Sequence, residues 1–169
     1  MTVAKDLLEL ARELAGLRDR AEHAAVVYED GSVLHLRGTP FGVGIPLVSD
    51  HGRAVAVVHT HPVPRTAPSL PDLQVLISMA RLGVPSPKLA TVYSDGVEAT
   101  VSVYTLRGPP PPELLRLIEE KAMEYEALSV ESRFDSSVSE KQLREQAAVL
   151  GRLGISVERY RFRLHPEQG

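Results

Sequence analysis

Apolar residues recur at helical and strand spacing along the first part of the chain. Residues 4–18 place leucines and alanines three and four positions apart among charged residues, which predicts an amphipathic helix with one buried face. The apolar stretches at 22–28 and 33–37 flank the turn-forming residues 29–32, so we expect a β-hairpin over 22–37. The chain is therefore expected to begin with a helix followed by two paired strands.

The middle of the chain combines a buried strand, a stiff loop and a helix. The strand is predicted over 53–58, where the five residues after Arg53 are all alanine or valine, as in strands buried on both faces. Four prolines between 62 and 71 exclude regular strand pairing there. A helix is predicted from Ser69 or Leu70 to Leu82, where Gly83 ends it. The other elements expected in the first two thirds are a loop at 38–46 and strands at 89–94 and 98–106.

Four consecutive prolines at 109–112 mark a boundary in the chain. After them the pattern predicts helices at 113–128 and 139–153 and a terminal strand at 155–164. The order of elements indicates an α/β fold with a mixed sheet. We expect a core at 1–108 and an α-rich extension at 109–169 that either packs on the core or forms a homodimer.

Composition narrows the classes of protein that the chain can belong to. Its 169 residues are 43% hydrophobic and 24% charged, which is typical of a globular domain, and the formal net charge is only -3. Binding to nucleic acid or to an anionic membrane is therefore not expected, and without a membrane span or signal peptide we expect a cytoplasmic protein. The chain lacks Asn and Trp and contains 13 prolines, which indicates either a thermophilic source or a biased genome.

Two histidines follow the buried strand, and they are the residues of this sequence that most clearly indicate a chemical function. His59 and His61 can turn both imidazoles toward one point, and Asp72 in the first turn of the next helix can add an oxygen there. Two imidazoles and one carboxylate are the ligand set of a catalytic zinc site that keeps one position for water. Because cysteine is absent, thiolate metal sites and a cysteine nucleophile are excluded. The same residues also have a structural interpretation, with the histidines as polar surface and Ser69 to Asp72 as a capping box.

Taken together, these residues resemble the signature of a known enzyme family. His59-Thr60-His61-Pro62, six further residues and then Ser69-Leu70-Pro71-Asp72 resemble the motif of JAMM zinc peptidases, also called JAB or MPN-plus, over residues 1–106. The resemblance implies a curved, cytidine-deaminase-like mixed sheet flanked by helices. It implies Zn²⁺ on His59, His61 and Asp72, and hydrolysis of the peptide or isopeptide bond after the C-terminus of ubiquitin or a ubiquitin-like protein. Ser69 would stabilise the oxyanion, and Thr60 occupies the small hydroxyl position between the histidines.

The family also uses a glutamate from an early strand as general base, and two residues are candidates. Glu22 opens the first apolar strand, which is where the family places this residue, whereas Glu29 lies in the following turn. We favour Glu22 as the base, although an exposed charge at a strand start is itself ordinary. We expect His23, on the opposite sheet face, and the isolated histidines at 35, 51 and 165 not to bind metal.

Three other functions are compatible with the same residues. They are a peptidase that processes a sulfur carrier, a DNA-associated relative of the RadC proteins, and an interaction scaffold that has lost its metal. The intact ligand set argues against the scaffold. Arginines at 152, 159, 161 and 163 form a basic stretch near the end of the chain, but we expect Glu158 and Glu167 to interrupt it, which argues against DNA binding.

Overall fold

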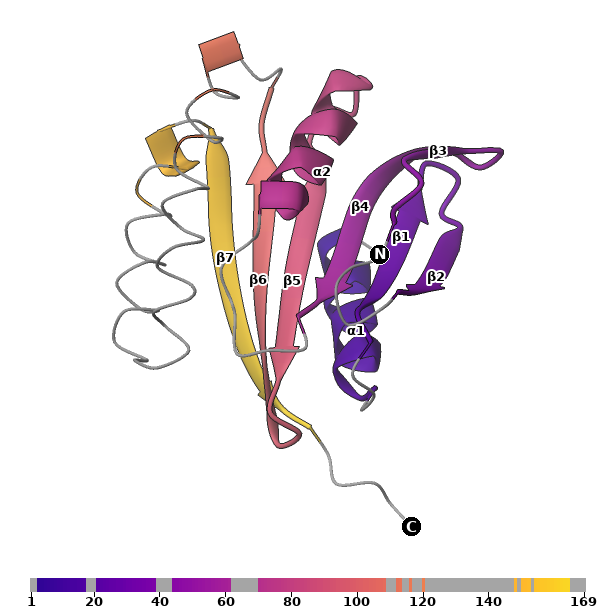
Figure 1. The fold of residues 1–169 in the computed structure, drawn as a ribbon, viewed down its shortest axis with the longest axis vertical. Helices are drawn as coiled ribbons and strands as arrows, with labels where there is room; N and C mark the ends of the chain where they lie inside the picture. The colour runs from indigo at the N-terminus through magenta and orange to yellow at the C-terminus, as the bar shows by residue number, and fades with distance from the viewer. Residues whose placement is uncertain are drawn as a thin grey trace.

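The chain folds around an open mixed sheet of seven strands (Figure 1). The computed structural model describes residues 3–17, 21–38, 44–61, 70–108, 112, 113, 116, 120, 148, 150–152 and 154–164. In chain order the elements are α1 (Val3–Ala15), β1 (His23–Tyr28), β2 (Val33–Arg37), β3 (Val48–Ser49), β4 (Gly52–Thr60), α2 (Leu70–Arg81), β5 (Lys88–Ser94), β6 (Glu98–Leu106) and β7 (Ile155–Arg163).

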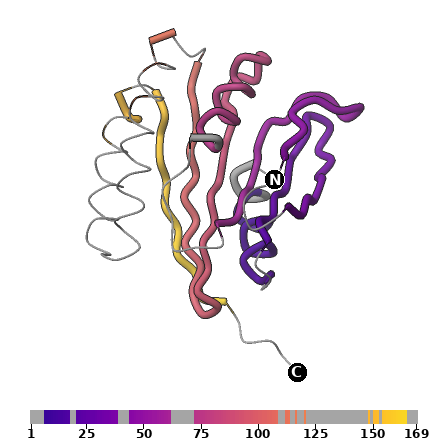
Figure 2. Tube along the Cα trace, viewed as in Figure 1, coloured from indigo at the N-terminus to yellow at the C-terminus, as the bar shows by residue number. Residues whose placement is uncertain are grey.

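The strands are ordered β2-β1-β4-β5-β6-β7, and β3 pairs with β4 beside this series. Strands β4 and β5 are parallel, and every other pair is antiparallel. A parallel pair needs a crossover connection, and here α2 lies in the segment that joins β4 to β5. Figure 2 shows the result, with β1 and β2 on one side of the central pair and β6 and β7 on the other. The end of β4 is thus enclosed within the sheet.

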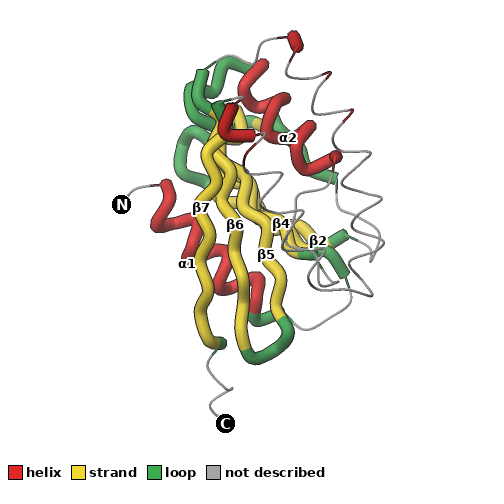
Figure 3. Tube along the Cα trace, turned by 90° about the vertical axis from the view of Figure 1, so that its left-hand side faces the viewer, coloured by secondary structure: helices red, strands yellow, loops and turns green. Residues whose placement is uncertain are grey.

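Helices α1 and α2 cover opposite faces of the sheet (Figure 3). The face under α1 forms one apolar cluster, in which Leu7, Ala11 and Leu14 pack against inward-facing strand residues. The face under α2 forms a second cluster around Leu73, Leu76 and other buried side chains. Because side chains alternate along a strand, successive residues of β1 and β4 contribute to different clusters. This alternation decides which polar side chains share a face with α2.

The structure confirms the α/β class and the mixed sheet, and it changes several boundaries. The first helix ends at Ala15 rather than residue 18, and β4 continues through Thr60 rather than stopping at 58. The reason for the longer strand is the parallel pairing with β5, which includes His59 and Thr60. The two-residue strand β3 was not predicted. Among the described helices, none is long and apolar enough to cross a membrane.

The terminal part of the chain contributes directly to the sheet. Strand β7 pairs with β6 along its whole length, so the expected strand of the C-terminal extension is hydrogen bonded to the predicted core. The described residues within 113–128 and 139–153 are helical, and the rest of both ranges lies outside the described residues. Dimerisation through this extension stays a prediction.

Glu29 has a structural partner at the far end of β1. Its carboxylate accepts hydrogen bonds from the Arg53 backbone amide at 2.7 Å and from Arg53 Nε at 3.0 Å. Gly52 has a positive φ of 97°, and a Cβ at this position would meet Glu29 Oε2 at 2.6 Å, so glycine suits both the turn and the close approach. The hydrogen bonds from Arg53 hold the pKa of Glu29 below its ordinary value of 4.5. Glu29 therefore joins β1 to the start of β4.

We expect the Glu29→Gln variant to have a lower melting temperature than the wild type at pH 7. Because the folded protein keeps Glu29 ionised to lower pH than the unfolded chain does, the charge stabilises the fold above pH 4.5. That stabilisation is lost as the pH falls through the lowered pKa. Thermal unfolding followed by circular dichroism should therefore show a difference between the two proteins that disappears in acid. A difference that is constant with pH would contradict this assignment.

Candidate metal centre

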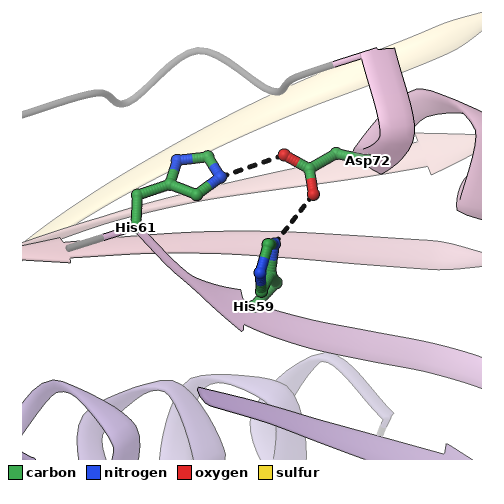
Figure 4. A group of neighbouring side chains, drawn as sticks. All are labelled: His59, His61 and Asp72. Carbon is green, nitrogen blue, oxygen red and sulfur yellow. Dashed lines mark hydrogen bonds and ion pairs between the residues drawn. The ribbon is translucent and has the colours of Figure 1, made fainter. Parts of the chain in front are cut away.

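Three buried polar residues meet where β4 ends and α2 begins. Asp72 lies between the two histidines, with Oδ1 at 2.8 Å from His59 Nδ1 and Oδ2 at 3.0 Å from His61 Nε2 (Figure 4). The imidazoles approach edge to face, with ring centroids 5.3 Å apart. All three residues are buried in an otherwise largely apolar region. The structure thus brings together the three residues that the sequence proposes as metal ligands.

The local fold explains why these side chains converge. His59 and His61 are two positions apart, so both project to the face that α2 covers. The His61 amide donates to the Val92 carbonyl at 2.8 Å, which continues the contact with β5 beyond the end of β4. Asp72 lies in the first turn of α2, where the helix dipole favours a negative charge. The buried neighbours Leu73 and Leu76 hold this end of the helix on the sheet.

This group can hold a metal ion. One ligand atom from each of the three residues lies within 4.8 Å of the others. Zinc bonds of about 2.0–2.2 Å in a tetrahedron would hold ligand atoms about 3.4 Å apart, so only small side-chain adjustments are needed. The donor set is two nitrogens and one carboxylate, which suits zinc and also suits iron(II). The geometry therefore supports a metal centre, and the donor types alone do not select the ion.

The ionisation of the group follows from its burial and its contacts. Burial by itself would lower the pKa of His59, but hydrogen bonds to Asp72 and Glu22, together with their negative charges, raise it to about 9. Burial by itself would raise the pKa of Asp72, yet the hydrogen bonds and charges of His59 and His61 hold it well below 3.8. The carboxylate is consequently ionised at neutral pH. A buried anion of this kind is a strong ligand for a cation.

Glu22 contacts the other side of the His59 ring. Its Oε2 lies 2.8 Å from His59 Nε2, and the Glu22 side chain is 14% exposed, so it lies at the margin of the group rather than inside it. Of the two candidate glutamates, Glu22 contacts a residue of the candidate metal centre, whereas Glu29 contacts Arg53. A carboxylate at this position can orient the imidazole or exchange a proton with a bound molecule.

Thr60 joins the start of β1, directly after Glu22, to the end of β4, where the histidines lie. The Thr60 Oγ1 accepts a hydrogen bond from the His23 backbone amide at 2.8 Å. The regular pairing of β1 with β4 begins only at Ala24 and His59, so the hydroxyl extends the contact by one residue. The small hydroxyl between the two histidines of the motif thus has a structural partner in β1. The contact holds the chain next to Glu22 close to His59.

The other candidate residues lie elsewhere or outside the described part of the chain. His23 lines a cavity of about 360 Å³ that α1 residues such as Leu14 form together with Thr60 and the metal-ligand candidate His61. His51 Nδ1 contacts Asp30 at 2.7 Å and is exposed, and His35 is exposed on β2. Ser69 and His165 lie outside the described residues.

Buried hydroxyls that the sequence pattern does not indicate lie beside the centre. The sheet register places Thr91 next to His59 and Ser102 next to Thr91, and both are buried. Tyr104 follows two positions after Ser102 on the same face of β6 and is also fully buried. These residues are scattered through two apolar strands, so only the pairing of β4, β5 and β6 reveals them as one row.

No family model, curated protein or solved structure matches this chain.

We expect the purified protein to bind close to one divalent metal ion per chain and His61→Ala to lose it. Replacing a residue that orients a ligand commonly costs about 10–100-fold in metal affinity, so removing a ligand should cost at least that much. Elemental analysis after dialysis and a competition titration with a chromogenic chelator would measure both quantities. His51→Ala is the matched control and should bind metal as the wild type does. Equal binding by the wild type and His61→Ala would exclude this centre.

We expect Thr60→Val to lower the free energy of unfolding by about 1 kcal/mol, because the His23 amide loses its acceptor. The change preserves the size of the side chain, and Thr60→Ser should restore most of the stability. Metal content should stay unchanged in both variants because the hydroxyl contacts no ligand atom in the structure. Denaturant unfolding measures the stability difference. Equal stability of the valine and serine variants would show that the hydrogen bond contributes nothing.

Proposed function

We propose that this chain is a zinc-dependent hydrolase that cleaves the peptide or isopeptide bond after the C-terminus of a ubiquitin-like protein. The observation that carries the proposal is the buried group of His59, His61 and Asp72 with Glu22 against the His59 ring. Two imidazoles and a carboxylate leave room for water on a tetrahedral ion, as catalytic zinc sites require. The resemblance of the motif to that of JAMM peptidases supports the reaction and the substrate class.

In this proposal His59, His61 and Asp72 bind the ion and Glu22 moves the proton. A zinc ion held there supplies a water of lowered pKa and an electrophile for the carbonyl oxygen. Glu22 accepts a proton from the attacking water and later delivers it to the departing amine. Ser69, two residues before Pro71 in the motif, stabilises negative charge on the carbonyl oxygen. The apolar side chains of α2 around the group limit access of bulk water.

Glu22 has a second role that the same contact permits. A carboxylate that holds one nitrogen of a metal-binding imidazole orients the ring and strengthens it as a ligand. An orienting residue affects metal affinity, whereas a general base affects turnover with the metal in place. Replacing Glu22 by glutamine keeps a hydrogen-bonding group of the same size and removes the proton acceptor. The two roles therefore predict different outcomes for one variant.

The order of elements and the state of the ligand set bear on the type of domain and on the alternative functions. A JAB-type domain is supported by the motif on a strand end and a helix start, with a helix and a hairpin before it. The buried, intact ligand set speaks against an interaction scaffold without metal. A sulfur-carrier-processing peptidase would use the same residues and differ only in its substrate, so a panel of fusion proteins separates the two.

We expect Glu22→Gln to retain zinc and to lose about 10²–10⁴-fold in turnover, the range that general acid–base catalysis contributes. The measurement is cleavage of ubiquitin-like and sulfur-carrier fusions, and of isopeptide-linked conjugates, alongside metal content on the same preparation. A chelator should abolish cleavage, and added zinc should restore it. Glu29→Gln is the matched control and should cleave at the wild-type rate under conditions where it is folded.

Three results would change this conclusion. Loss of zinc together with activity in Glu22→Gln would make Glu22 an orienting residue. Inactivity of Glu29→Gln with an active Glu22→Gln would overturn the choice of the base. A protein that binds zinc and cleaves no member of the panel would retain the metal centre and reject the peptidase function, and bound iron would point to a different reaction class.

A further inference from the structure

The cavity of about 360 Å³ that His23 lines is built from the ends of four elements. Its lining residues come from the end of α1, the start of β1, the end of β4 and the end of β5. Strand β5 continues past the residue that pairs with the end of β4, so the cavity lies where β4 stops within the sheet (Figure 1). In open α/β sheets, ligands bind beyond the carboxyl ends of parallel strands, and β4 and β5 are such a pair. We call this space the β4-end cavity.

The β4-end cavity adjoins the candidate metal centre. His61, one of the three proposed ligands, lines the cavity together with Thr60. Ala21 and His23 line it as well, and these two residues flank Glu22 in the chain. In the proposed mechanism Glu22 delivers a proton to the departing amine, so the segment that carries this amine lies beside Glu22. That segment is therefore the part of a substrate that is closest to the cavity.

One wall of the cavity is apolar. It consists of Leu14, Ala15 and Leu17 from α1 and its C-terminal end, with Val92 of β5 nearby. Leu14, Ala15 and Val92 are buried, whereas Leu17 is 48% exposed and can be covered further by a ligand. Ligand sites usually have volumes of about 300–1,000 Å³, so this cavity is large enough for one long side chain. An apolar wall suits the methylene stem of such a side chain.

A fixed carboxylate lies at the side of the cavity that the turn after β5 forms. Asp95 Oδ1 accepts hydrogen bonds from the backbone amides of Glu98 and Val97, both at 2.8 Å. These bonds lower the pKa of Asp95 below 3.8, so the side chain is ionised at neutral pH. Among the described residues, no donor contacts the second oxygen, Oδ2.

The charge of the cavity wall is therefore negative. Of the described residues that line the cavity, Asp95 is the only carboxylate, and none is a lysine or an arginine. Ammonium and guanidinium groups form charge-assisted hydrogen bonds with carboxylates. An apolar wall with an anion beside it matches a side chain that has an apolar stem and a cationic tip.

We propose that the β4-end cavity binds a charged lysine or arginine side chain of the departing segment, with its stem on the α1 wall and its cation at Asp95. The assignment to the departing segment rests on the proposed function, whereas binding of the basic side chain requires no turnover. An acidic side chain would meet a like charge at Asp95, and a short side chain would leave the apolar wall uncovered. A lysine whose amine forms the cleaved bond is neutral and is not this residue.

The test measures binding of short fluorescein-labelled peptides to the full chain by fluorescence anisotropy. Four peptides of otherwise identical, uncharged sequence carry lysine, norleucine, alanine or glutamate at one central position. Norleucine has the stem of lysine without its charge. The comparison of lysine with norleucine therefore measures the ion pair, and that of norleucine with alanine measures the contact of the stem.

Two protein variants change the two parts of the cavity separately. Asp95→Asn removes the charge and keeps an oxygen for the turn amides, and Ala15→Leu fills space beside the apolar wall. Asp30→Asn is the matched control, because Asp30 also accepts a backbone amide of a turn, that of Ser32 at 2.8 Å, at the other end of β1. Leu17→Ala at the exposed part of the wall serves if Ala15→Leu does not fold.

We expect the norleucine peptide to bind about tenfold more tightly than the alanine peptide, because each fully buried methylene contributes about fourfold and the stem is partly buried. The lysine peptide should bind a further 2–5-fold more tightly, roughly as an exposed ion pair allows, and added salt should remove this difference. Asp95→Asn should abolish the preference for lysine over norleucine and leave binding of the norleucine peptide unchanged. Ala15→Leu should weaken both by about tenfold and Leu17→Ala by about 2–5-fold. Asp30→Asn should bind all peptides as the wild type does.

Three outcomes would overturn the proposal. They are equal binding of the four peptides, tightest binding of the glutamate peptide, and a preference for lysine that persists in Asp95→Asn. Cleavable fusions with lysine, alanine or glutamate in the departing segment add a second readout, in which Asp95→Asn should raise KM for the lysine fusion and leave kcat and metal content unchanged. Lysine-selective binding without cleavage of any fusion would retain the ligand of the cavity and reject the peptidase function. Cleavage without any selectivity among the peptides would do the reverse.

Discussion

The structure depends on one buried carboxylate, that of Asp72, which lies between the imidazoles of His59 and His61. Withdrawing an ion from water costs several kcal/mol, and only close partners offset this cost. Removing one partner of a buried ion pair typically costs about 3–5 kcal/mol, because the remaining charge is left without compensation. The contact joins the start of α2 to the end of β4, so the packing of the helix and the geometry of the proposed metal centre depend on the same atoms.

The alternation of side chains along β1 and β4 distributes the other polar groups around this carboxylate. His59 and His61 share the α2 face, and Glu22 reaches the His59 ring from the start of β1. His23 and Thr60 lie on the α1 side, where the Thr60 hydroxyl holds the His23 amide. A shift of one residue in the pairing of these strands would exchange the two faces. The side-chain hydrogen bond at Thr60 therefore supports the register on which the centre depends.

Beyond α2 the same sheet face changes from apolar to polar. Near the helix it carries core residues such as Leu89 and Ile155, and farther along the strands it carries Ser102 and the exposed side chains of Arg159, Arg161 and Arg163. The buried hydroxyls lie between the metal centre and Arg159.

The sequence by itself determined the class of fold and the three residues that we propose as metal ligands. Apolar periodicity predicted most strands and the two described helices, because burial of one face imposes a period that sequence records directly. His59, His61 and Asp72 were predicted as a group because they lie close together along the chain, on a strand end and a helix start. The extension of β4 to Thr60 and the strand β3 were not predicted, since both arise from pairing with other segments.

Tertiary structure alone decided the relations between residues that are distant in sequence. It paired Glu29 with Arg53 and Glu22 with His59, whereas the sequence offered both glutamates as candidates and only favoured Glu22. It also placed Glu158 on the face opposite the arginines and aligned Arg159 with His59 across four strands. Strand order and register are long-range properties, set by which segments pair, and no local pattern of apolar and polar residues encodes them.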